Sequence, residues 1–154
     1  MYKGQRILAV VPARGGSLGI TRKNIVPLGG RPLIHHTLEQ IREVEELDLA
    51  VVSTDDDEIA AIAIEGGGQV IMRPAELSIA TSKTEEALLH ALEHLSAEGQ
   101  VQFDYICVLE PTSPFRSAAT IGACLRALID SNAKSLMTVV ETRANIGQLK
   151  NGYF

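Results

Sequence analysis

Short apolar runs alternate with amphipathic segments along the chain. Five runs are rich in β-branched and other apolar residues, as buried strands are, and they cover 6–12, 49–54, 69–73, 105–110 and 135–141. Four segments repeat apolar residues at helical spacing, and they cover 32–44, 55–65, 84–95 and 120–129. Strands separated by helical crossovers predict an α/β domain with a mostly parallel central sheet and helices on both faces.

The length of 154 residues fits one domain with a substantial core. No window approaches the roughly 18 consecutive apolar residues of a membrane span. The first residues lack a signal-peptide pattern, so we expect a soluble, cytoplasmic protein without a membrane partner. Cys107 and Cys124 fall inside apolar patterns, where thiols usually behave as small buried hydrophobes, so we expect neither a disulfide framework nor a cysteine metal site.

Charge is distributed unevenly. The formal net charge of −5 argues against nonspecific nucleic-acid binding, which needs a broad basic surface. Residues 1–38 nevertheless carry six lysines and arginines and no acidic residue, whereas 39–65 carries ten acidic residues and one arginine. A cationic region within an acidic chain predicts a small anionic ligand.

Three polar loops follow predicted strands, at the sheet edge where ligands of open α/β sheets bind. They read "ARGGSLGITRKN" (13–24), "STDDD" (53–57) and "EPTSPFR" (110–116). The first combines glycines with Arg14, Arg22 and Lys23, which suits a phosphate cradle. It matches neither the P-loop nor the dinucleotide fingerprint, so a solvated glycine-rich connection is the alternative. The lack of acidic residues in the loop favours the anion site.

Two further groups have the chemistry of metal ligands. The consecutive carboxylates Asp55, Asp56 and Asp57 suit Mg²⁺, although the acidic start of a helix explains them equally well. His90 and His94 have the spacing of two ligands on one helix face, but they lie opposite a leucine stripe, so a solvated face is the better interpretation. The metal ligands therefore stay unassigned.

Taken in order, "VPARGGSLGITRKNI", "GGRPLI", "STD", "RPAELS" and "EPTSPFR" resemble the acylneuraminate cytidylyltransferases, or CMP-sialic acid synthetases, and the related synthetases for Kdo, legionaminic and pseudaminic acids. The resemblance covers nearly the whole chain. It implies a Rossmann-like nucleotidyltransferase fold and a reaction in which CTP and a 2-keto nonulosonic acid give a CMP-sugar and pyrophosphate. It also implies Mg²⁺ as the cofactor and leaves a homodimer open.

The resemblance also assigns roles to residues that match the family's motifs. It places Arg14 and Lys23 on the triphosphate as the catalytic side chains. The nucleotide-binding positions that it implies are Ala13, Arg14, Gly15, Gly16, Ser17, Lys23, Asn24, Arg73, Ser82 and Thr84, with Arg73 near the cytosine. On the sugar side it implies Glu110, Thr112, Ser113 and Arg116.

Several positions depart from the family pattern. Leu18 stands where a lysine is expected, Thr21 where a proline is common, Ala80 where an aspartate is common and Glu110 where glutamine is usual. Family chains also continue beyond this length, so we expect a cytidylyltransferase-like domain (1–154) without the C-terminal part that holds the magnesium carboxylates and the dimer segment. Two alternatives follow: a degenerate or truncated member that binds nucleotide without turnover, and a nucleotidyltransferase for another base or sugar.

Overall fold

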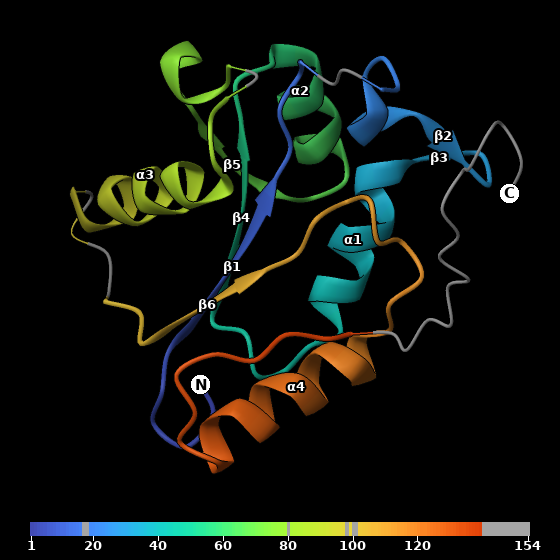
Figure 1. Ribbon diagram of the computed structural model, residues 1–154. Helices are drawn as coiled ribbons and strands as arrows, with labels where there is room; N and C mark the ends of the chain where they lie inside the picture. The colour runs from blue at the N-terminus through green and yellow to red at the C-terminus, as the bar shows by residue number, and fades with distance from the viewer. Residues whose placement is uncertain (17–18, 80, 98, 100–101, 140–154) are drawn as a thin grey trace, which may run out of the picture.

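A parallel sheet forms the centre of the protein (Figure 1). The computed structural model describes residues 1–16, 19–79, 81–97, 99 and 102–139. Within these residues the sheet has four strands in the order β5-β4-β1-β6. They are β1 (Ile7–Pro12), β4 (Leu49–Thr54), β5 (Gln69–Met72) and β6 (Tyr105–Val108), all paired in parallel.

Helices cover both faces of this sheet. The helices α1 (Leu33–Arg42), α2 (Asp57–Glu65) and α4 (Ala118–Asp130) pack on one face and α3 (Thr84–Ala97) on the other (Figure 1). Alternate residues of β1 enter the two cores, because side chains alternate along a strand. The central strand is thus apolar throughout, and the predicted α/β fold class is confirmed. Among the described residues, no helix is both long and apolar enough to span a membrane.

Four short elements lie in the connections from β1 to α1 and from β5 to α3. A 3₁₀ turn, η1 (Lys23–Ile25), leads into a hairpin of β2 (Pro27–Leu28) and β3 (Arg31–Pro32), and a second turn, η2 (Ala75–Leu77), follows β5. Both residues of the hairpin turn, Gly29 and Gly30, have positive φ, as a type I′ turn requires. The hairpin was not predicted, because two-residue strands leave no alternation to detect.

The predicted fifth strand at 135–141 is wrong for its described part. Residues 135–139 are not in a strand, and Val140 and Glu141 lie outside the described residues. Met137 and Val139 are largely exposed, and residues 136–138 line a groove beside β6 and α4. An apolar β-branched run becomes a strand only where a sheet edge pairs with its backbone, which these residues do not do.

Candidate active site

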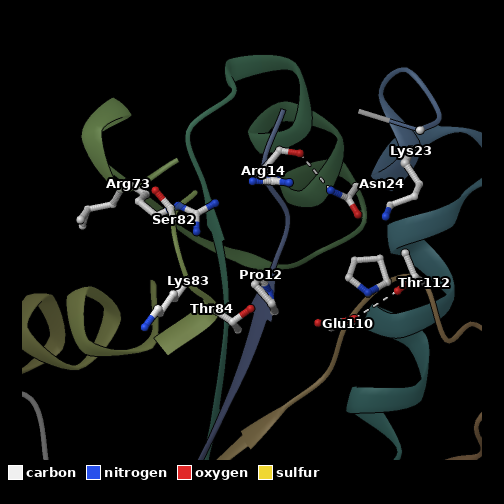
Figure 2. Close-up of a pocket in the computed structure, with 13 residues that line it drawn as sticks. Pro12, Arg14, Lys23, Asn24, Arg73, Ser82, Lys83, Thr84, Glu110 and Thr112 are labelled. Atoms are coloured by element: carbon white, nitrogen blue, oxygen red, sulfur yellow. Dashed lines mark hydrogen bonds between the residues drawn. The ribbon is translucent and has the colours of Figure 1, made fainter. Parts of the chain in front are cut away.

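A cavity of about 390 Å³ opens at the carboxyl ends of the strands (Figure 2). Its wall combines the loop after β1, the segment between β5 and α3, and the loop after β6. The lining residues are Pro12, Arg14, Gly19, Lys23, Asn24, Arg73, Leu77, Ser82, Lys83, Thr84, Glu110, Pro111 and Thr112. The structure therefore gathers most of the predicted site residues, from three distant parts of the sequence, around one space.

The loop after β1 is closed at its base by Asn24. The Asn24 side chain is buried and donates a hydrogen bond from Nδ2 to the backbone carbonyl of Arg14 (3.0 Å, Figure 2). The Arg14 guanidinium in turn donates from Nη1 to the carbonyl of Ile79 (3.1 Å), in the segment after β5. These two bonds fix Arg14 between two walls of the cavity.

Arg73 is a buried side chain of the wall with hydrogen-bond donors that lack acceptors among the described residues. Its side chain is only 5% exposed, and Nη2 lies 3.7 Å from the Asp55 carboxylate, too far for a hydrogen bond. Among the described residues, Nε and Nη2 have no hydrogen-bond partner. Burial lowers the pKa of Arg73, Asp55 opposes that shift, and Arg14 adds to it. Buried donors normally have acceptors, so a bound ligand that supplies them would stabilise this guanidinium.

The charge of the cavity wall is strongly positive. Among the described lining residues, four side chains are cationic, Arg14, Lys23, Arg73 and Lys83, and one is a carboxylate, Glu110. Such a wall suits a ligand with several negative charges. Lys83 was missed from the sequence, although it lies between the predicted Ser82 and Thr84 just before α3.

Arg22, the third basic residue of the loop, does not line the cavity. Its guanidinium donates to both carboxylate oxygens of Asp56, at 2.9 and 2.8 Å, and also contacts Glu58. Asp56 caps α2, and Asp55 accepts a hydrogen bond from the backbone N–H of Gly15 (3.1 Å). Among the described residues, no three histidine, cysteine or acidic side chains gather as metal ligands.

The predicted sugar-side residues are divided between two spaces. Glu110 and Thr112 line the cationic cavity, whereas Ser113 and Arg116 line the groove between β6 and α4, which Glu110 also reaches. Arg116 donates to the Glu110 carbonyl (2.9 Å) and to Oγ1 of the buried Thr37 (3.0 Å), and burial lowers its pKa. Arg116 therefore ties the loop after β6 to α1.

The remaining predicted positions lie behind the wall or outside the described residues. Ala13 is buried in the core and donates its backbone N–H to the Ser53 carbonyl (2.9 Å). Gly15 and Gly16 follow it in the loop without lining the cavity. Ser17, Leu18 and Ala80 lie outside the described residues.

A parallel sheet with a cationic cavity at the carboxyl ends of its strands defines an α/β domain whose site suits an anionic ligand. Comparison with known proteins narrows this class. The family model described as "Cytidylyltransferase" matches residues 8–151. The chain belongs to the cytidylyltransferase family.

Individual relatives agree with this assignment. The chain is 32% identical over 140 residues to an N-acylneuraminate cytidylyltransferase of Escherichia coli, which is 91% of this chain and 32% of the relative. It is 39% identical over 117 residues to a CMP-N,N'-diacetyllegionaminic acid synthase of Legionella pneumophila, which is 75% of this chain and 50% of the relative. The chain therefore spans about half or less of these two proteins.

A solved structure shares the fold. A CMP:2-keto-3-deoxy-manno-octonic acid synthetase in complex with CTP superposes with a TM-score of 0.69 at 24% identity. The match covers 84% of this chain and 49% of that one. The expected Rossmann-like nucleotidyltransferase fold is thereby confirmed.

Proposed function

We propose that this chain binds CTP in the cationic cavity and is the nucleotide-binding part of a cytidylyltransferase that transfers CMP to a nonulosonic acid. The observation that carries the proposal is Arg73, a buried guanidinium with unpartnered donors in a wall that holds three more cations. Family membership and the relatives named for acylneuraminate and diacetyllegionaminic acid support the choice of CTP and of a sialic-type acid.

In the proposed reaction the anomeric hydroxyl of the sugar acid attacks the α-phosphorus of CTP. A P–O bond forms to the sugar, the hydroxyl proton passes to solvent water, the bond from the α-phosphorus to the β-phosphate oxygen breaks, and pyrophosphate leaves with the electron pair of that bond. Such a step depends on charge neutralisation and in-line positioning rather than on a covalent enzyme intermediate. Arg14 and Lys23 supply positive charge to the triphosphate, and Arg73 contacts the nucleotide deeper in the wall.

Magnesium belongs to the proposal, because the resemblance implies it. When bound, it would neutralise charge on the triphosphate. Glu110 is the carboxylate that the described wall offers, and it would share the ion with the triphosphate oxygens, since Mg²⁺ is commonly held by one or two carboxylates together with substrate phosphates. A homodimer stays a prediction, which light scattering after gel filtration tests.

The sugar side of the proposal is limited to a substrate class. The named relatives act on different acids, so no single acid is favoured. Glu110 faces the same cavity as Lys23, at a position where the family usually has an amide. Its negative charge opposes the carboxylate of an acidic sugar, which makes Glu110 the residue to test for acceptor choice.

Calorimetric titration of the chain with CTP, UTP, GTP and ATP tests the nucleotide. We expect CTP to bind most tightly; failure of all four to bind would refute the proposal, and preference for another base would refute cytidylyl transfer. Pyrophosphate release from CTP, Mg²⁺ and a panel of nonulosonic acids then tests the reaction.

A second candidate function is a family member that binds CTP without turnover. Leu18 favours it, because it stands where the family pattern has a lysine. CTP binding without pyrophosphate release would support this second candidate.

A further inference from the structure

The basic side chains of the loop after β1 are used in two different ways. Arg14 and Lys23 line the cavity, whereas Arg22 is held by the turn between β4 and α2. We propose that Arg22 and Asp56 form a clamp that positions this loop for the triphosphate, and that Arg22 itself does not contact the nucleotide. This positioning role rests on the proposed function, because it presupposes that the loop binds CTP.

The Arg22 guanidinium forms two hydrogen bonds to the Asp56 carboxylate. Its two terminal nitrogens reach the two Asp56 oxygens at 2.9 and 2.8 Å, the paired geometry that gives the strongest arginine–carboxylate interactions. Arg22 also has a positive φ of 52°, which is unfavourable for a residue with a side chain. Hydrogen bonds from its side chain to a fixed partner compensate for that backbone conformation.

Asp56 is such a fixed partner. Its Oδ1 accepts hydrogen bonds from the backbone N–H groups of Glu58 and Ile59, each at 3.0 Å, and so caps the first turn of α2. The helix packs against β4 and β5 through the buried Ile59 and Ala63. Arg22 is therefore attached to a rigid part of the sheet scaffold.

A second attachment lies at the other end of the loop. The Gly15 N–H donates to Asp55 (3.1 Å), and the Gly15 backbone passes so close that a Cβ there would lie 2.5 Å from an Asp56 oxygen. Gly15 is the chain neighbour of Arg14, and Arg22 is the chain neighbour of Lys23. The two attachments thus hold the neighbours of the two cations assigned to the triphosphate, and they reduce the ordering that CTP would otherwise impose.

A direct role for Arg22 is the competing explanation: the guanidinium would leave Asp56 and contact a phosphate. The two explanations predict opposite effects of Asp56→Asn, which keeps an oxygen that caps α2 but removes the charge of the paired carboxylate and leaves the exposed Glu58 as the described carboxylate that still contacts Arg22. If Arg22 contacts a phosphate directly, the Asp56→Asn variant should bind CTP as tightly as the unaltered chain or more tightly. If Arg22 positions the loop, the same variant should bind CTP less tightly.

The test compares Arg22→Met, Asp56→Asn and the double variant, each in the otherwise unaltered chain. The measured quantities are the Kd for CTP, the Kd for CMP and the unfolding temperature. Arg126→Met is the matched control, because Arg126 pairs with Glu46 far from the cavity and has a similar exposure of 45% against 38% for Arg22. If Arg22 positions the loop, each single variant should raise the Kd for CTP about tenfold and the Kd for CMP less than twofold. The double variant should raise the Kd for CTP no further than either single variant does. The control should leave both Kd values unchanged.

Other outcomes are equally decisive. Unchanged or tighter CTP binding by Asp56→Asn, or an equal loss for CTP and CMP, would overturn the positioning role while the proposed function stands. Additive losses in the double variant would overturn it as well, because a clamp acts as one unit. If the unaltered chain binds no CTP, the proposed function fails, and the positioning role fails with it.

Discussion

Substitution of Arg73 by methionine should move nucleotide affinity and protein stability in opposite directions. Methionine nearly matches the length of the aliphatic part of arginine and carries no charge. The free protein loses a buried guanidinium whose Nε and Nη2 lack acceptors among the described residues. Asp55 keeps its hydrogen bond from Gly15, so the change leaves no unpaired buried carboxylate behind. We therefore expect the free variant to be as stable as the unaltered chain or more stable.

The magnitudes follow from the burial of this side chain. Replacing a whole buried ion pair by apolar groups of similar volume is often neutral or stabilising by about 1–4 kcal/mol, whereas removing one partner of a well-formed buried pair is destabilising. Arg73→Met is closer to the first case, because the 3.7 Å contact with Asp55 is too long for a hydrogen bond and the Asp55 side chain is 20% exposed. In a domain of this size each kcal/mol raises the unfolding temperature by roughly 2–4 °C. If CTP accepts hydrogen bonds from Nε and Nη2, each charge-assisted bond contributes about 1.5 kcal/mol or more. The loss of two such bonds raises the Kd for CTP roughly a hundredfold.

The assay combines thermal unfolding monitored by circular dichroism with calorimetric titration of CTP. Arg126→Met serves as the control, because Arg126 is a partly exposed arginine paired with Glu46 at the opposite end of the sheet. An Arg73→Met variant that unfolds at least 5 °C earlier and binds CTP normally would refute the reasoning. In that case the guanidinium stabilises the fold, and its unpartnered donors do not mark a ligand site.

Three further predictions concern other parts of the cavity. Lys83→Ala should raise the Kd for CTP about fivefold at low salt and by a smaller factor at high salt, because salt screens the lost charge. Lys134→Ala, beyond the last turn of α4, is the control and should leave the Kd for CTP unchanged. Gly15→Ala should weaken CTP binding at least about tenfold and lower the unfolding temperature, because its Cβ would meet the capping carboxylate of α2 at 2.5 Å. Gly16→Ala meets nothing within 4 Å and should leave the unfolding temperature unchanged. Glu110→Gln should lower the KM for the sugar acid and, because Glu110 also lines the proposed CTP cavity, should not raise the Kd for CTP; a higher KM would contradict a repulsive role for Glu110.

The main elements of the fold follow from the sequence because helices and strands differ in their apolar period. The run 49–54 was predicted with its observed bounds, and α1 and α3 differ from their predictions by two residues or fewer at each end. Convergence of the loops could also be foreseen, since the carboxyl ends of parallel strands meet at one edge. The capping role of Asp56 explains why α2 begins at Asp57 rather than at the predicted Asp55.

Pairing between distant side chains could not be predicted in the same way. The sequence presents Arg14, Arg22 and Lys23 as three equivalent cations, and only the fold brings Asp56, 34 positions further along, against Arg22. The same limit applies to Arg116, whose contact with Thr37 directs it away from the cationic cavity. Local patterns state which residue types are present, whereas tertiary contacts decide which charges are already neutralised.

This distinction changes what the uneven charge of the chain means. Three of the six basic side chains in residues 1–38 form ion pairs in the described structure, and the acidic stretch that follows provides the partners of two of them, Arg22 and Arg31. Arg14 and Lys23 form no ion pair with a described residue and line the cavity, where Arg73 and Lys83 join them. The charge available to a ligand is therefore set by pairing rather than by composition. A cavity that keeps four cations close together, with Asp55 near Arg73 and Glu110 in the wall as the described counter-charges, is costly to the free protein, and a polyanionic ligand lowers that cost. The salt dependence of CTP affinity should then follow the cations of the cavity wall and not Arg22.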